Sequence, residues 1–184
     1  LMNALLDKFR AGGAEKGADL LIHGDVTENL KSALDIALSD DVNKEESEAF
    51  EHMLTQKEVI EGVPADEYAN LVALLYEHGV NNEVVTDKIR KMLNQVIMNI
   101  SGNEELEKKV KNKFYSLFAS PNEKYLAFGI NFMDSFVEII RGDIADFVSW
   151  VDTCLQHDDK EVHQKAVRVV RELSEMIIEE NKNK

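Results

Sequence analysis

The chain has 184 residues, 44% apolar and 30% charged, a composition typical of a globular protein and not of a disordered acidic segment. Its 35 acidic and 21 basic side chains give a net charge of −14, which opposes nucleic-acid binding because phosphate carries the same sign. The best uncharged apolar stretch, Tyr125 to Met133, is nine residues long, so we expect no membrane contact through a spanning helix. One cysteine, Cys154, allows no internal disulfide, and an acid at Asp7 interrupts any signal peptide; both predict a cytoplasmic protein.

Apolar residues recur at every third or fourth position, and no segment alternates apolar and polar residues as a strand would. The pattern predicts an all-α protein with two short N-terminal helices and eight longer ones. The expected helices span 2–10, 14–22, 27–39, 44–60, 65–78, 83–100, 103–119, 121–141, 144–156 and 159–180. The helix expected at 121–141 is apolar on nearly all sides, which predicts that it lies at the centre of the molecule.

Helix starts are predicted from a short polar residue followed three positions later by glutamate, because the two side chains satisfy free N–H groups of the first turn. The pairs are Asn43 with Glu46, Ser101 with Glu104, Ser120 with Glu123 and Asp158 with Glu161. Ser120 is favoured further because Pro121 follows, and proline fits the first helical position. Glycine adopts the left-handed conformation that closes helices, and four glycines are expected to do so. They are Gly24, Gly62, Gly79 and Gly142.

Each single-faced helix needs a partner that covers its apolar stripe. The expected stripes are Leu30, Ala33, Leu34, Ala37 and Leu38; Val85, Ile89, Met92, Val96 and Ile100; Ile144, Phe147, Val148, Val151 and Leu155; and Val162, Ala166, Val169, Val170, Leu173 and Ile177.

The eight longer helices pair naturally into four hairpins that follow the short helices of residues 1–24, within a single domain. The hairpins are expected at 25–62, 63–100, 101–142 and 143–181. Their second helices would start after Asn43, Asn82, Ser120 and Asp158, which are separated by 39, 38 and 38 residues. A period near 40 with two helices per unit is typical of stacked helical hairpins, an α-solenoid. A compact irregular bundle remains the alternative, because helices of this length with short loops give similar spacings.

The last hairpin carries a resemblance to a known family. The stretch LQHDDKEVHQKAVRVVRELSEMI, Leu155 to Ile177, resembles the inner half of a HEAT repeat, with an acidic turn at Asp158 and Asp159 and with Arg168 matching the basic member of the family's Asp-to-Arg ladder. This HEAT/armadillo-like resemblance implies stacked hairpins that bind other proteins. A second stretch, LKSALDIALSDDVNKEESEAF from Leu30 to Phe50, resembles the acidic helix-turn-helix of the tellurite-resistance TerB type, which implies a ligand- or metal-responsive helical bundle.

Negative charge is concentrated between residues 35 and 67, where eleven acids and two bases give a net −9. Glu45, Glu48 and His52 fall on one face of the helix expected at 44–60, away from its apolar face. A solvated helix face explains this pattern, but so does docking of a basic protein or peptide, because a concentrated field speeds encounter. We predict partner binding at this surface. The residues are Glu45, Glu48, Glu51 and His52.

A divalent metal is the third interpretation of the acidic stretch. The candidate ligands are Asp40, Asp41, Asn43 and Glu46. The spacing begins like a calcium loop, but the loop glycine is missing and His52 stands where a bidentate acid is needed. We therefore predict no metal site.

Catalytic motifs are not found either. The five histidines form no His-Glu-x-x-His pair, no serine lies in a Gly-x-Ser-x-Gly elbow, and the glycines of Arg10 to Gly17 lack the lysine of a phosphate-binding loop. His163 stands four residues after Asp159, close enough on a helix to share a metal or to make an ordinary hydrogen bond. We predict a scaffold or adaptor that binds a partner protein, with no enzymatic activity and no cofactor; the alternative is a TerB-like, metal-responsive bundle. The sequence does not predict an oligomeric state.

Overall fold

The computed structural model describes residues 3–12, 17–118, 120–129, 152 and 155–183, and within these it contains helices and no strand. The expectation of an all-α protein is confirmed for this part of the chain. The helices are α1 (Ala4–Ala11), α2 (Asp19–Ile22), α3 (Val26–Leu38), α4 (Lys44–Thr55), α5 (Lys57–Gly62), α6 (Ala65–Asn81), α7 (Thr86–Ile100), α8 (Glu104–Phe118), α9 (Glu123–Gly129) and α12 (Lys160–Lys182). None of them is long and apolar enough to cross a bilayer.

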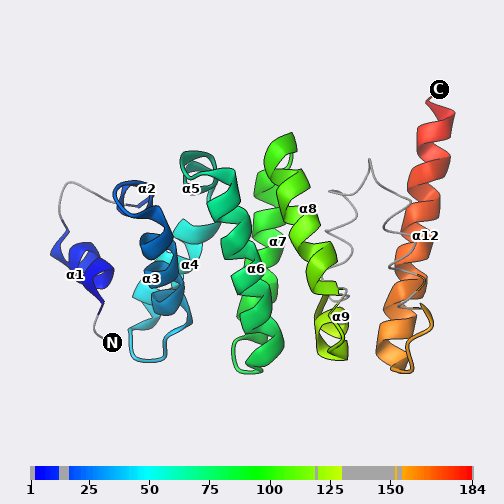
Figure 1. Ribbon diagram of the computed structural model, residues 1–184, viewed down its shortest axis with the longest axis horizontal. Helices are drawn as coiled ribbons and strands as arrows, with labels where there is room; N and C mark the ends of the chain where they lie inside the picture. The colour runs from blue at the N-terminus through cyan, green and yellow to red at the C-terminus, as the bar shows by residue number, and fades with distance from the viewer. Residues whose placement is uncertain (1–2, 13–16, 119, 130–151, 153–154, 184) are drawn as a thin grey trace.

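The helices lie side by side along the longest axis of the molecule, with α1 at one end and α12 at the other (Figure 1). Within the expected hairpins, α3 packs against α4 and α6 against α7. Between them, α3 contacts α6, α4 contacts α7, and α6 packs extensively against α8. First helices therefore meet first helices in these contacts, and α4 meets α7, whereas α9, the second helix of the third expected hairpin, packs against the first helix α6.

The first helices also recur at a constant interval. Asp25, Pro64 and Asn103 directly precede α3, α6 and α8, and they are 39 residues apart each time. The second helices α4 and α7 follow Asn43 and Val85, a spacing of 42 that is less regular than the sequence suggests. The spacing is thus most regular between the starts of α3, α6 and α8.

The apolar stripes form a continuous core that extends from α1 to α9 and includes two residues of α12. The stripe expected on α7, from Val85 to Ile100, is entirely buried, as is that of α3 except for the partly buried Leu38. In α12, Val162 and Ala166 are buried, but Val170 is 38% exposed, contrary to the expected stripe. The stripe of residues 144–155 lies outside the described residues except for the partly buried Leu155.

Three predicted helix starts are displaced because another side chain reaches the first-turn amides. Asn43 caps α4 as expected, with Oδ1 accepting from the Glu46 N–H at 2.9 Å. Asn103, not Ser101, caps α8, and Asn122, not Ser120, precedes α9, so Pro121 lies before the helix. Asp159, not Asp158, caps α12 by accepting from the N–H groups of Glu161 and Val162.

The glycines also differ from the prediction. Gly24 has φ 81° and follows α2 as a helix stop. Gly62 is the last residue of α5, where a helix stop was expected, but has no positive φ, and Gly79 lies inside α6, also without a positive φ. A Cβ on Gly79 would lie 2.3 Å from Cζ of the buried Phe128, so glycine is needed here for close packing of α9 against α6. Gly142, the rest of the predicted central helix beyond Gly129, and most of the helix expected at 144–156 lie outside the described residues.

Candidate functional site

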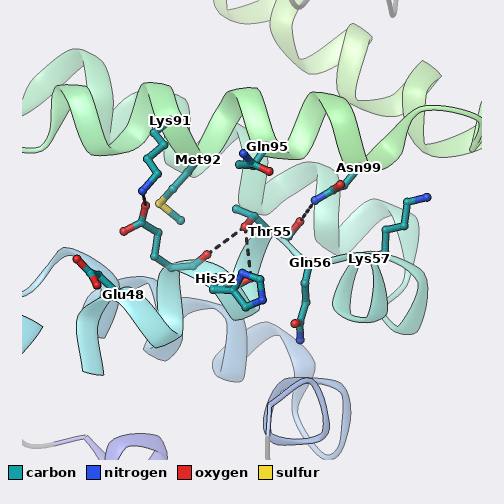
Figure 2. Close-up of a pocket in the computed structure, with 10 residues that line it drawn as sticks. Glu48, His52, Thr55, Gln56, Lys57, Lys91, Met92, Gln95 and Asn99 are labelled. Atoms are coloured by element: carbon teal, nitrogen blue, oxygen red, sulfur yellow. Dashed lines mark hydrogen bonds and ion pairs between the residues drawn. The ribbon is translucent and has the colours of Figure 1, made fainter. Parts of the chain in front are cut away.

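An open groove of about 470 Å³ runs between α4 and α7, the second helices of two neighbouring hairpins. Its lining is Glu48, Glu51, His52, Thr55, Gln56, Lys57, Lys91, Met92, Gln95 and Asn99 (Figure 2). A second hollow of about 320 Å³ shares Glu48, Glu51 and Lys91 with it, so the two hollows are adjacent along the α4–α7 contact. We call the two hollows together the α4–α7 groove.

One end of the groove is formed by an unexpected break in the helix predicted at 44–60. The chain leaves the helical conformation at Gln56, with φ −79° and ψ 150°, which separates α4 from α5. The Thr55 hydroxyl bonds the main-chain oxygens of Glu51 and His52, a pattern that bends helices. Asn99 of α7 donates its side-chain N–H to the Thr55 carbonyl at 2.6 Å and satisfies an oxygen freed by the break.

The structure brings three of the four predicted partner-binding residues into this groove. Glu48 and His52 are exposed on its α4 wall, as the helical face predicts, and Glu45 is exposed one turn earlier but outside the lining. Glu51 differs, because it is 8% exposed and its carboxylate faces α7. The Lys91 ammonium lies 3.6 Å from that carboxylate (Figure 2).

The groove is therefore not uniformly acidic. Lys44 lies 3.8 Å from Glu48, and Lys91 and Lys57 are part of the lining. Lys88, which lines the second hollow, donates its ammonium to the Ala37 carbonyl at 2.8 Å and to the Ser47 hydroxyl at 2.9 Å. This places a cation at the C-terminal end of α3, where the helix dipole favours it, and joins the two hairpins.

The α7 wall of the groove is not among the site residues predicted from the sequence. Lys88, Lys91, Gln95 and Asn99 follow one another at three- and four-residue steps, which places them along one side of a helix. That row lies directly beside the buried Met92 and Val96, and this adjacency is the signal that it faces a neighbouring helix.

Two of the four residues considered for metal binding have other partners. Asn43 caps α4, and Glu46 forms a bidentate pair with Arg10 of α1, at 2.7 Å to Nε and 2.9 Å to Nη2. The Arg10 hydrogen bonds hold the pKa of the Glu46 carboxyl below its usual range, and the same contact raises the pKa of Arg10. Asp40 and Asp41 are exposed. Among the described residues, no three histidine, cysteine or acidic side chains are grouped as metal ligands would be.

The acidic turn of the last hairpin is also accounted for by local structure. The Asp159 carboxylate accepts from the first-turn amides of α12, while Nδ1 of His163 contacts the Leu155 carbonyl at 2.8 Å. His157 Nδ1 accepts from the Asp159 N–H at 3.0 Å. Asp159 and His163 thus each have a backbone partner in place of a shared ion.

Two further contacts join first helices across hairpins. Lys109 of α8 lies 2.6 Å from Asp66 at the start of α6, which lowers the pKa of the Asp66 carboxyl and raises that of Lys109. Thr27 of α3 donates to Glu67 of α6 at 2.8 Å. Part of the charge between residues 35 and 67 therefore joins neighbouring hairpins and is not free for a partner.

Comparison of the chain with protein-family models, with curated proteins and with solved structures gave no match. Function is therefore inferred from the geometry of the site alone.

Proposed function

We propose that this chain is a non-enzymatic interaction scaffold of stacked helical hairpins, and that an extended segment of a partner protein binds in the α4–α7 groove. The observation that carries the proposal is the groove itself, which spans two hairpins and exposes Glu48 and His52 beside a row of polar side chains on α7. The constant 39-residue interval and the contacts between like helices support the stacked arrangement, the α-solenoid of the HEAT/armadillo type.

A binding role fits the chemistry of the lining better than catalysis does. Among the residues that the structure describes, the hydroxyl that lines the larger hollow is that of Thr55; it donates to main-chain oxygens and has no activating base in hydrogen-bond contact. The wall instead offers side-chain amides, two lysines and two carboxylates, which can pair with the main chain and charged side chains of a peptide. Two exposed acids, Glu48 on the α4 wall and Glu45 one turn earlier, favour a basic partner on the α4 side of the groove.

The test is selection of a library of random twelve-residue peptides on the intact chain, followed by charge reversal. Glu45→Lys with Glu48→Lys changes the α4 wall and its approach, whereas Glu58→Lys with Glu61→Lys makes the same charge change at exposed positions of α5 that do not line the groove. We expect enriched peptides to bind at least about tenfold more weakly to the first variant, and within about twofold of wild type to the control. Glu51 is left unchanged because it is buried.

Failure to enrich any peptide, or equal binding to both variants, would overturn the proposal. Calcium titration separates the metal-responsive alternative, because a ligand that binds only the folded chain raises its melting temperature. A large rise would favour that alternative.

A further inference from the structure

Two glutamates on α4 occupy similar surroundings but have very different partners. Glu46 and Glu51 expose 9% and 8% of their surface, and each side chain is 11% accessible. Arg10 holds Glu46 through two hydrogen bonds, one to each carboxylate oxygen. In the part of the chain that the structure describes, Glu51 has a single ion-pair contact, with Lys91 at 3.6 Å, and its carboxylate accepts no hydrogen bond.

Because of this difference, the Glu51 carboxylate has hydrogen-bond acceptor positions that no donor occupies among the described residues. A carboxylate offers about four acceptor positions, and a nitrogen at 3.6 Å is too distant to be a hydrogen-bond donor to any of them. Burial of an ionised carboxylate is unfavourable unless hydrogen bonds replace the lost water. The Lys91 side chain is 73% exposed, so its ammonium can move into solvent at little cost. Glu51 is thus a nearly buried anion with an easily displaced cation.

The groove gives an incoming side chain access to that anion. Glu51 lines both hollows of the α4–α7 groove, and so does Lys91, which Figure 2 labels. Glu48, three residues earlier on α4, also lines both hollows and is exposed. When Lys91 leaves, Glu51 has no cation within ion-pair distance among the described residues, whereas Lys44 still lies 3.8 Å from Glu48.

We infer that an arginine side chain of the partner segment inserts into the α4–α7 groove, where its guanidinium forms a bidentate pair with Glu51 and displaces Lys91. The inference rests on the proposed function and adds the chemistry of the anchor residue. Arginine is preferred over lysine because its planar fork matches a carboxylate with two parallel hydrogen bonds. Glu46, on the same helix as Glu51, is bound in this bidentate way by Arg10 of α1, and Glu51 has no such partner among the described residues.

The probe is acetyl-arginine methylamide, with acetyl-citrulline methylamide as the uncharged isostere, titrated into the intact chain. The side-chain amide NMR signals of Gln95 and Asn99, which line the groove, report the binding. We expect the arginine compound to shift these signals with a dissociation constant at least about tenfold lower than that of the citrulline compound. Glu51→Gln should weaken arginine binding by about tenfold.

Lys91→Met and Lys57→Met are matched variants, because both remove one positive charge from the groove lining and only the first removes the competitor of the ligand. Lys91→Met should strengthen arginine binding about threefold to tenfold and Lys57→Met less than about twofold. Equal strengthening by the two would reduce the effect to general electrostatics and overturn the inference. This comparison also decides the question if Glu51→Gln does not fold.

The other outcomes separate this inference from the proposed function. Groove-binding peptides that need no arginine, or equal binding of the citrulline compound, would overturn the arginine anchor while leaving the scaffold proposal in place. Inorganic phosphate is a further probe; if it shifts the same signals and the arginine compound does not, the groove binds anions through Lys57 and Lys91, and the inference is wrong.

Discussion

Neighbouring hairpins meet in two chemically different ways, and the contrast explains where a ligand can bind. Around α6, α8 and α9 the contact is rich in aromatic rings: Tyr76 of α6 packs edge to face against Phe128 of α9 at 4.9 Å and is tilted against Phe114 and Phe118 of α8 at 6.0 and 5.9 Å. Between α4 and α7 the contact is made by single polar side chains around an open groove. The first kind of contact supplies stability, and the second leaves room for a partner.

The largest effect is expected in the aromatic contact. Phe128→Ala removes a 5% exposed ring from between Tyr76 and Gly79 and should lower the free energy of unfolding by about 3–5 kcal/mol. Urea denaturation followed by circular dichroism measures this. A loss below about 1 kcal/mol would show that α9 contributes little to the stability of the aromatic contact, and the difference in stability between this contact and the α4–α7 contact would be refuted.

A smaller effect is expected at Gly79, where the same contact is too close for a side chain. In Gly79→Ala the new methyl group would lie 2.3 Å from Phe128 and 2.9 Å from Ile89, so overpacking should cost about 1–3 kcal/mol despite the better helix propensity of alanine. Phe128→Leu in the same chain should recover part of this loss. A Gly79→Ala protein more stable than wild type would mean that the two helices are not held at this distance.

On the groove side, Asn99→Leu should cost only about 1 kcal/mol, because it removes one hydrogen bond to the Thr55 carbonyl at the α4–α5 break. Gln95→Leu is the matched control, since Gln95 lies one turn away on the same wall and is exposed. It should change stability by less than about 0.5 kcal/mol. Equal losses would show that the Asn99 bond does not maintain the break.

The smallest effect concerns pH and the partly exposed Arg10–Glu46 pair. The folded-state pKa of Glu46 lies below its ordinary value of 4.5, so the pair stabilises the protein above that value. Its contribution decreases as pH falls through 4.5 and is lost below the folded pKa, while Arg10 stays charged throughout. Glu46→Gln should flatten the fall in melting temperature between about pH 5 and pH 2. Glu51→Gln is the control, since it removes a glutamate of the same helix that has no arginine partner. If Glu46→Gln leaves the dependence of melting temperature on pH unchanged, the Arg10–Glu46 pair does not contribute to acid stability.

The sequence predicts the helical elements well because apolar periodicity reflects burial directly. The α7 stripe from Val85 to Ile100 is an example, since every expected position is buried. Helix ends were predicted less well, because several polar residues at a junction compete for the same amides, as Ser101 and Asn103 do before α8. The break at Gln56 was not predicted, because no glycine or proline marks it. The side chain that satisfies the freed Thr55 carbonyl is that of Asn99, which lies 44 residues further along the chain.

Only part of the candidate site could be predicted from the sequence. Exposure of Glu48 and His52 follows from helical geometry within one segment. The burial of Glu51 and its contact with Lys91 depend on how two hairpins pack, which local patterns do not specify. The same holds for the Arg10–Glu46 pair, whose members are 36 residues apart.

Lys88 and Lys91 stand one turn apart on α7 and divide two tasks between them. Lys88 donates hydrogen bonds to the Ala37 carbonyl and the Ser47 hydroxyl and so links α7 to α3 and α4. Lys91 has one ion-pair contact, at 3.6 Å to Glu51, and faces the groove. Displacement of Lys91 would therefore leave the Lys88 hydrogen bonds intact, and under the proposed function the backbone of both groove walls would be in place before a partner binds. Such preorganisation spares the complex the entropy loss of ordering a wall on contact.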